Sequence, residues 1–281
     1  MEDTTTRTLG KSGIEVSALG LGCWAIGGPA WRDETPVGWG QIDDQESEKA
    51  VQRAIDLGVT FFDTADVYGA GHSETVLGKA VGKRRDSVVI ATKFSNVFDE
   101  EAKQITGSDA SPEYIKQACD ASLRRLDTDY IDLYQFHNGG YDIDRAEEVM
   151  DTLERLVEAG KIRAYGWSTD DPDRAELFAK GEHCAAIQHQ MNVLTGPTPA
   201  LPVCEKSKLA SINRGPLAMG LLSGKYNRES ELPADDVRGK NAPTWMKYFT
   251  GGRPSEEFLE RLASIREVLT GEGRSLVQGA L

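Results

Sequence analysis

The stretch that decides the fold is FFDTADVYG, residues 61–69. It opens with two aromatic side chains, as a buried strand does, and then places Asp63, Asp66 and Tyr68 close together before a glycine. A segment that is apolar first and polar at its end is typical of a barrel strand whose carboxyl end leaves the core at a functional site. Other segments of the chain repeat this arrangement.

Short apolar runs and amphipathic stretches alternate along the chain, which predicts alternating strands and helices. The expected strands are residues 18–22, 60–63, 88–93, 130–137, 162–167, 185–188 and 209–213. The expected helices are residues 45–57, 73–81, 111–126, 146–159, 171–180, 201–208 and 254–269. Ser73 is expected to cap the second helix, and Ser111 followed by Pro112 is a typical helix start.

This alternation predicts an α/β chain with a parallel sheet wrapped by helices. Seven units are more than most doubly wound sheets contain, and one fewer than in a (β/α)₈ TIM barrel. The turn after the first strand, GLGCWAIGG, lacks the G-x-G-x-x-G of a Rossmann fold. We therefore expect one barrel domain over residues 1–281, without its eighth βα unit. The long segments 23–44 and 222–253 are expected to be loops that cover the site.

The composition predicts a water-soluble globular protein, with 39% hydrophobic residues and a net charge of −13. The N-terminus has no signal peptide, and no apolar run approaches the roughly 20 residues of a membrane span, so a cytoplasmic location without membrane contact is expected. The acidic balance argues against a nucleic-acid partner. No cysteine pair has C-x-x-C spacing, which favours reduced thiols over a zinc site or disulfides, and no metal is expected. The oligomeric state stays open.

Polar residues follow the predicted strands, at the end where the strands of a barrel present their chemistry. In chain order these are Asp63, Tyr68, Lys93, His137, Ser168, Gln188 and Arg214. Each has an ordinary structural explanation when taken alone, because an aspartate often caps a turn and a lysine at a strand end is usually solvated. Their position at one rim favours a shared chemical role.

Four of these residues suit the reduction of a carbonyl group. A tyrosine has an ordinary pKa of about 10, and a nearby lysine cation lowers that pKa. Asp63 would keep Lys93 charged, and His137 would orient a carbonyl oxygen. Tyr68 would protonate that oxygen as a general acid, while the hydride comes from a cofactor because no side chain supplies one. A barrel aldolase with a Schiff base on Lys93 is an alternative, but it gives Tyr68 no task.

The chain resembles the aldo-keto reductases, NADPH-dependent enzymes built on a (β/α)₈ barrel. The resemblance rests on GVTFFDTADVYGAGHSETVLGKA (58–80), VVIATKF (88–94), YIDLYQFH (130–137), KIRAYGWST (161–169) and GPLAMGLLSGKY (215–226). It implies that NADP(H) is the cofactor and that small carbonyl substrates, aldehydes or ketones, are reduced to alcohols. The implied catalytic tetrad is Asp63, Tyr68, Lys93 and His137.

The family also suggests an alternative function. Potassium-channel β subunits resemble these enzymes, bind NADPH and act mainly as partners of another protein. A regulatory protein with little turnover is therefore the second hypothesis. His137 favours the enzyme, because those subunits carry asparagine at the matching position.

The resemblance further implies which residues bind the cofactor. Ser168 and Gln188 match residues that hold the nicotinamide carboxamide, and Arg214 falls where many members stack an aromatic ring on the nicotinamide. The segment that wraps the pyrophosphate matches Gly215, Pro216, Leu217, Gly220 and Lys225. Trp24 falls in the first substrate loop, where it either lines the substrate pocket or serves in packing.

The chain stops in RSLVQGAL, where the family's seventh helix begins. In the family an eighth strand and helix follow and bind the adenosine with its 2′-phosphate. Because the sequence does not contain this unit, the expectation of NADP rather than NAD rests on the resemblance alone. A barrel without this unit would leave the edges of its first and seventh strands unpaired. We therefore expect a domain that is incomplete at its C-terminus, from a natural chain that continues past Leu281 or has been truncated.

Overall fold

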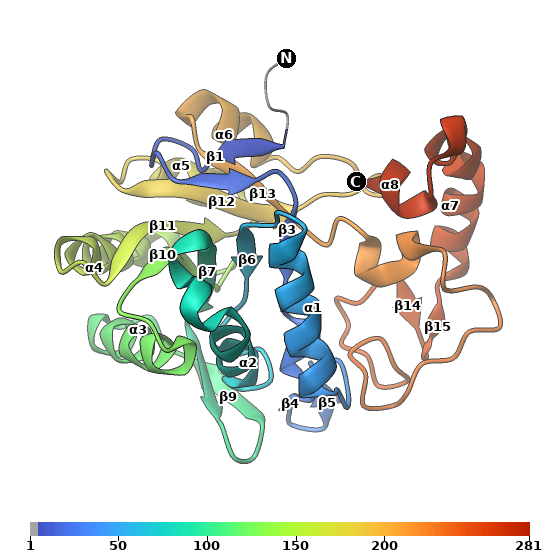
Figure 1. Ribbon diagram of the computed structural model, residues 1–281, viewed down its shortest axis with the longest axis horizontal. Helices are drawn as coiled ribbons and strands as arrows, with labels where there is room; N and C mark the ends of the chain where they lie inside the picture. Colours follow the sequence, from blue (N-terminus) through green and yellow to red (C-terminus); the bar gives the residue numbers. More distant parts are fainter. Residues whose placement is uncertain (1–4) are drawn as a thin grey trace.

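The computed structural model describes residues 5–281, and its centre is a curved sheet of seven parallel strands (Figure 1). The order across the sheet is β13-β12-β11-β10-β7-β6-β3. The strands are β3 (Gly20–Gly22), β6 (Phe61–Asp63), β7 (Val89–Phe94), β10 (Ile131–Phe136), β11 (Ile162–Ser168), β12 (Cys184–Gln190) and β13 (Ala210–Arg214). All seven predicted strands are confirmed in their chain order.

The two edges of this sheet are β3 and β13, and within residues 5–281 they do not pair with each other. The sheet therefore has the seven strands of an incomplete (β/α)₈ wall, as the sequence predicts. Every neighbouring pair in it is parallel, so all carboxyl ends point to the same rim. This rim collects the polar residues that follow the strands.

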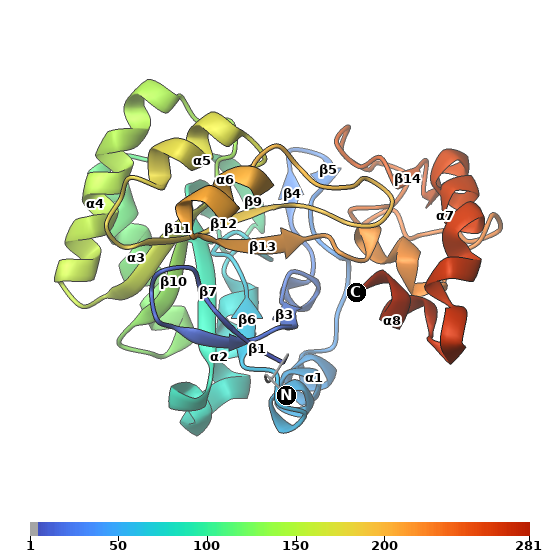
Figure 2. The same ribbon diagram turned by 90° about the horizontal axis from the view of Figure 1, so that it is seen from above.

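Helices α1 to α6 pack around the outside of the sheet (Figures 1 and 2). They are α1 (Asp44–Asp56), α2 (His72–Val81), α3 (Pro112–Leu126), α4 (Ala146–Glu158), α5 (Pro172–Phe178) and α6 (Leu201–Ser207). Ser111 caps α3 by accepting a hydrogen bond from the backbone of Tyr114, as predicted. The predicted cap at Ser73 is wrong. Gly71 precedes α2, and the buried hydroxyl of Ser73 donates to the carbonyl oxygen of Cys23.

An N-terminal hairpin covers the amino end of the barrel interior. Its strands are β1 (Thr6–Thr8) and β2 (Glu15–Ser17). Leu9 and Ile14 are buried in one cluster with Phe61 and other inward-facing strand residues. The next residue, Phe62, belongs instead to the main core between the sheet and the helices, as the two-residue period of a strand requires. The opposite rim is the end of the barrel that remains available for a site.

Both segments that were predicted to be long loops contain further structure. Residues 23–44 contribute two short strands to a second sheet, of order β5-β4-β9-β8. Its strands are β4 (Trp31–Arg32), β5 (Thr35–Pro36), β8 (Asn96–Asp99) and β9 (Gln104–Ser108).

Within residues 5–281, no helix is both long and apolar enough to cross a membrane.

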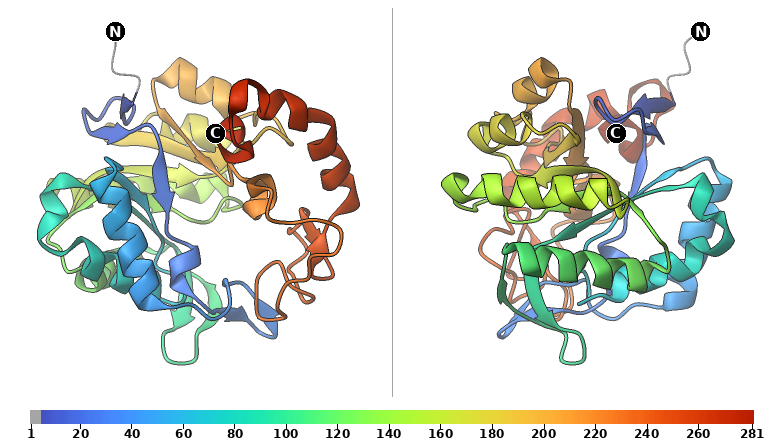
Figure 3. Two further views of the ribbon diagram at one scale, coloured as in Figure 1. Left: turned by 45° about the vertical axis from the view of Figure 1, so that its right-hand side comes forward. Right: turned by 90° about the vertical axis from the view of Figure 1, so that its left-hand side faces the viewer.

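Residues 222–253 form a second hydrophobic core with the last helices of the chain. Leu222, Val237 and Phe249 are buried there together with Leu262 and Leu276. Figure 3 shows these C-terminal elements gathered beside the main sheet. They are β14 (Phe249–Thr250), β15 (Arg253–Pro254), α7 (Glu256–Leu269) and α8 (Leu276–Ala280). The remaining short 3₁₀ turns are Ala25–Gly27, Gly82–Ser87, Ile143–Arg145, Ala218–Ser223 and Gly271–Gly273.

Candidate active site

Lys93 is the centre of a polar cluster at the carboxyl rim. Its side chain, on β7, is fully buried. The ammonium nitrogen Nζ lies 2.6 Å from Oδ1 of Asp63 and 2.6 Å from the carbonyl oxygen of Thr64. The phenolic oxygen of Tyr68 lies 3.3 Å from the same nitrogen. The structure thus places two of the other three residues of the predicted tetrad, Asp63 and Tyr68, at the buried cation of Lys93.

Tyr68 reaches Lys93 because the chain turns sharply after β6. Gly69, the next residue, has φ of +60°, and a Cβ atom there would lie 1.8 Å from the carbonyl oxygen of Gly27. The ammonium of Lys103 donates a hydrogen bond of 2.9 Å to the carbonyl oxygen of Gly69. The glycine that ends FFDTADVYG is therefore required by a close backbone contact with residues 23–44.

His137 follows β10 and completes the tetrad. Its ring meets the ring of Tyr68 edge-on, with centroids 5.9 Å apart and an interplanar angle of 86°. Its Nδ1 is buried without a hydrogen-bond partner among the described residues. Burial, and then the positive charges of Lys93 and Arg214, hold the pKa of His137 well below its ordinary value. The imidazole is therefore neutral at physiological pH and retains hydrogen-bonding capacity for a ligand.

The net pKa of Tyr68 lies above its ordinary value, contrary to the sequence prediction. Burial is the largest cause, and the cation of Lys93 opposes it without cancelling it. For Lys93 itself, burial lowers the pKa, but the charges of Asp63 and Tyr68 raise it, and the net pKa is above the ordinary one. The cluster at neutral pH therefore contains a charged lysine and a phenol that keeps its proton.

Two glutamines complete the surroundings of Asp63. The amide nitrogen of Gln188 lies 2.8 Å from its Oδ2, and that of Gln135 lies 3.0 Å from the same oxygen. Gln188 was predicted at the rim, whereas Gln135 was missed because it lies inside the strand rather than at its end. The signal that could have identified it is a glutamine near the end of the mostly apolar strand IDLYQF, where the structure buries it completely.

Ser168, Gln188 and Arg214 lie at the ends of three neighbouring strands. Ser168 pairs with Gln188 in the register of β11 and β12. Arg214 ends β13, and its Nη2 lies 2.6 Å from Oδ2 of Asp170. Its Nε is buried without a partner among the described residues. The positive charge of Arg214 makes a small contribution that lowers the pKa of both Tyr68 and His137.

The turn at residues 215–225 contains unusual backbone conformations. It is called here the cofactor turn, because the sequence resemblance implies that it wraps the pyrophosphate. Gly215 and Gly220 have φ of +64° and +92°. Ala218 and Met219 also have positive φ, which residues with a side chain rarely adopt. Of the other residues predicted here, Pro216 and Leu217 are half-buried and Lys225 is exposed. Strain of this kind concentrates at functional sites, and the turn follows directly after Arg214.

Three tryptophans form what we call the aromatic wall, at the side of Tyr68. Trp24 stacks on the ring of Tyr68, with centroids 5.6 Å apart and an interplanar angle of 23°. Trp39 meets Trp24 edge-on at 5.7 Å, and Trp245 lies tilted against it at 6.2 Å. Trp245 is 54% exposed. The sequence indicated Trp24 as a pocket residue, but it did not indicate that Trp245, from the distant segment 222–253, lies beside it.

Asp66 lies between Asp63 and Tyr68 in the turn after β6, and the structure buries it. The residue is 1% exposed, and neither oxygen of its carboxylate has a hydrogen-bond partner among the described residues. Burial and the nearby charge of Glu74 hold the pKa of Asp66 well above its ordinary value, against the opposing charge of Arg125. The carboxyl group is thus held in its protonated form inside the turn that carries Tyr68.

Asp66→Asn should remove a pH-dependent loss of stability. A carboxyl group with a raised pKa in the folded state binds its proton more tightly when folded, so folding is penalised as the pH rises above the ordinary pKa of about 3.9. The wild-type free energy of unfolding should therefore fall relative to that of Asp66→Asn by about 1.4 kcal/mol per pH unit, until the raised pKa is passed. Urea unfolding between acidic and neutral pH measures this difference, and a constant difference across that range would contradict the protonated state.

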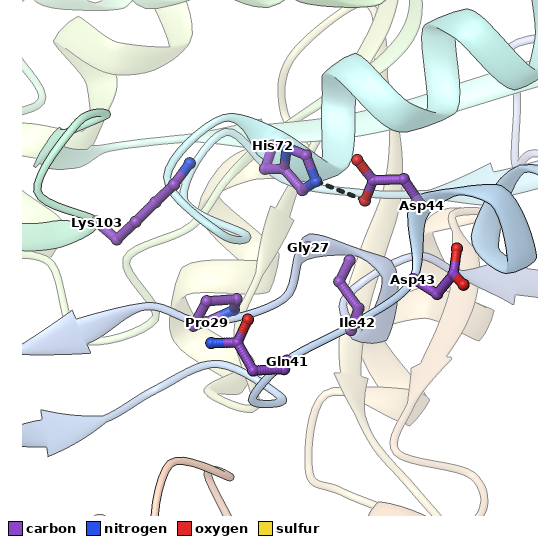
Figure 4. Close-up of a pocket in the computed structure, with 8 residues that line it drawn as sticks. All are labelled: Gly27, Pro29, Gln41, Ile42, Asp43, Asp44, His72 and Lys103. Atoms are coloured by element: carbon purple, nitrogen blue, oxygen red, sulfur yellow. Dashed lines mark hydrogen bonds and ion pairs between the residues drawn. The ribbon is translucent and has the colours of Figure 1, made fainter.

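A surface pocket of about 520 Å³ is lined by residues of the segment 23–44 together with His72 and Lys103 (Figure 4). His72 Nε2 and Asp44 Oδ1, 2.8 Å apart, join the first turns of α2 and α1 beside it. Lys103 lines the same pocket and contacts the turn through Gly69. None of the tetrad residues lines this pocket, so it is separate from the polar cluster.

Comparison with known proteins agrees with this geometry. A model of the aldo/keto reductase family matches residues 18–281. Aldo-keto reductase YhdN of Bacillus subtilis is 34% identical over 263 residues, which are 92% of this chain and 76% of that protein. Aldo-keto reductase yakc (NADP(+)) of Schizosaccharomyces pombe is 28% identical over 276 residues, covering 95% of this chain and 77% of that protein.

The fold is similar to that of a glycerol dehydrogenase from Gluconobacter oxydans, with a TM-score of 0.77 and 33% sequence identity. That match covers 98% of this chain and 80% of the other. Since the family model spans nearly the whole chain and the rim carries the polar cluster described above, the protein belongs to the aldo/keto reductase family of oxidoreductases.

Proposed function

We propose that this protein reduces aldehydes or small ketones to alcohols with NADP(H), as one barrel domain over residues 1–281. The observation that carries the proposal is the convergence of Lys93, Asp63, Tyr68 and His137 at one rim. Four buried free cysteines and an acidic surface suit the reducing cytoplasm, which we propose as its location.

In the proposed reaction, Tyr68 donates its proton to the carbonyl oxygen as that oxygen gains negative charge. The raised pKa keeps the phenol protonated at neutral pH, so the donor is ready in the resting site. Lys93 stabilises the phenolate that remains, and Asp63 keeps the lysine charged and in place. The neutral His137 orients the carbonyl oxygen. When bound, NADPH supplies the hydride, which no side chain of the chain can provide.

The residues of the rim fit a nicotinamide dinucleotide. Ser168 and Gln188 lie side by side where they would hold a carboxamide, and the guanidinium of Arg214 has a buried Nε without a partner among the described residues. The cofactor turn with Lys225 would hold the pyrophosphate. The printed name of the Schizosaccharomyces pombe relative specifies NADP(+), which supports NADP over NAD for this chain.

The aldolase alternative is disfavoured by the state of Lys93. A Schiff base needs a neutral amine with access to substrate. Here the amine is fully buried, contacts three oxygen atoms and has a raised pKa. The lysine is therefore arranged as a fixed cation.

Turnover and cofactor binding test the proposal together. With glyceraldehyde or 4-nitrobenzaldehyde, the purified protein should consume NADPH, and titration followed by NADPH fluorescence should give a lower dissociation constant for NADPH than for NADH. Tight NADPH binding without any turnover would favour the regulatory alternative. Absence of both turnover and binding would rule out the reductase, and trapping of a substrate on Lys93 with borohydride would support the aldolase.

A further inference from the structure

We propose that Arg238 is a positioning residue that ties the cofactor turn to the aromatic wall, so that one side chain sets both the cofactor site and the substrate site. This inference rests on the function proposed above. Arg238 lies in the segment 222–253, outside the tetrad and outside the residues that the sequence analysis singled out. Its guanidinium makes three sets of contacts: one to Asp236 within its own segment, one to the cofactor turn and one to the aromatic wall.

The first set fixes the guanidinium itself. Arg238 Nη2 lies 2.7 Å from Oδ2 of Asp236, and Nε lies 2.9 Å from Oδ1 of the same carboxylate. The backbone nitrogen of Arg238 donates to that Oδ1 as well, at 2.8 Å. Both side chains are more than nine-tenths buried. A bidentate pair of this kind holds the planar guanidinium in a single orientation.

The second set reaches the cofactor turn. Arg238 Nη1 donates to the carbonyl oxygen of Met219 at 3.1 Å and to the hydroxyl of Tyr226 at 3.0 Å. Met219 is one of the strained residues with positive φ. A Cβ atom on Gly220 would lie 3.3 Å from the same Nη1, so the guanidinium packs directly against the turn. Arg238 therefore compensates for part of the strain in this backbone.

The third set reaches the aromatic wall. The guanidinium carbon lies 4.2 Å from the ring centroid of Trp39, whose edge contacts Trp24, which in turn stacks on Tyr68. The backbone supports this contact, because Val237 N donates to the carbonyl oxygen of Gly38 at 2.7 Å. Contacts therefore run without interruption from the carbonyl oxygen of Met219 to the ring of the proposed acid.

The tie joins two segments that lie far apart in the chain. The aromatic wall begins after β3 and the cofactor turn begins after β13, which are the two edge strands of the sheet among residues 5–281. A lysine could not replace Arg238, because one ammonium group cannot bind both oxygens of Asp236, donate to Met219 and lie over the ring of Trp39 together.

Arg238→Lys tests this role. We expect the dissociation constant for NADPH and the KM for the aldehyde each to rise about tenfold, roughly the loss of one net hydrogen bond made by a charged group. The kcat at saturation with both should change little, because no reacting group is removed. A purely structural role predicts the opposite: less folded protein would lower the apparent kcat and leave both binding constants unchanged.

Two further variants separate the contacts from the fold. Asp236→Asn combined with Arg238→Met removes both buried charges. This variant should also raise the dissociation constant for NADPH and the KM for the aldehyde, and its melting temperature should be near that of Arg238→Lys. In a Trp39→Leu background, Arg238→Lys should no longer raise the KM for the aldehyde but should still weaken NADPH binding. Arg228→Lys is the matched control, because Arg228 lies on the same segment as Arg238 and makes a bidentate pair with Glu256 of α7, but at the surface.

The outcomes distinguish this inference from the proposed function. NADPH binding is measured without turnover, so a wild-type protein that binds NADPH but reduces no aldehyde refutes the reductase. The role of Arg238 at the cofactor turn is then decided by the NADPH titration of Arg238→Lys. Unchanged constants in Arg238→Lys, or equal effects in Arg228→Lys, would overturn the tie. A wild-type protein that does not bind NADPH would overturn both.

Discussion

Tyr68→Phe is expected to lower kcat for carbonyl reduction by about 100- to 10,000-fold, the range that a positioned general acid contributes. The substitution removes the phenolic oxygen, which lies 3.3 Å from Lys93 Nζ, and keeps the ring that stacks on Trp24. NADPH binding should therefore stay close to the wild-type value. Steady-state kinetics and NADPH fluorescence titration on the same preparation measure the two effects.

A matched control for this prediction is Tyr130→Phe. Tyr130 precedes β10 at the end of the barrel opposite to the rim, with the guanidinium of Arg85 over its ring at 4.1 Å. Loss of the Tyr130 hydroxyl should leave turnover unchanged. If Tyr68→Phe kept a turnover comparable to that of this control, the proton would come from another group and Tyr68 would be misassigned.

Lys93→Met should abolish measurable reduction and also destabilise the fold, by about 3–5 kcal/mol, as when one partner of a buried ion pair is removed. The lysine is fully buried, and without it the half-buried carboxylate of Asp63 keeps hydrogen bonds only from the two glutamine amides among the described residues. The cation also lowers the pKa of Tyr68 against burial, so its loss makes the phenol a still weaker acid. Kinetics and urea unfolding measure the two losses separately.

Asp63→Asn combined with Lys93→Met separates chemistry from stability. Removing both charges should recover much of the lost free energy of unfolding, because no uncompensated charge remains in the core. Activity should stay absent, since the phenolate would still lack its cation. Recovery of activity together with stability would mean that Lys93 serves only the fold.

The strands, and the position of the tetrad residues at one rim, could be predicted from sequence because both depend on the order of residues within short segments. The change from apolar to polar marks each strand end, and parallel pairing then brings Asp63, Lys93 and His137 to one rim. The direction of the Tyr68 pKa could not be predicted, because it depends on how burial compares with the charge of Lys93. That balance is known only once the side chain has been placed.

Contacts between distant segments were missed for a related reason. Trp24 and Trp245 are 221 residues apart in sequence, and only the packing of residues 222–253 brings their rings together. Ser73 follows the usual rule for a helix cap, but α2 begins before it, so its hydroxyl satisfies a buried carbonyl oxygen instead. In sequence, Arg238 resembles an ordinary loop residue. Its contacts with Met219 and Trp39 join distant segments, and no local pattern predicts them.

The contact between Gly27 and Gly69 limits how this enzyme could be redesigned. A Cβ atom at Gly27 would lie 2.8 Å from the backbone carbon of Tyr68, and one at Gly69 would lie 1.8 Å from the carbonyl oxygen of Gly27. The two backbones therefore pack so closely that neither position has room for a Cβ atom. Libraries that diversify residues 23–44 should keep Gly27 fixed, because any other residue there would displace Tyr68, the proposed general acid.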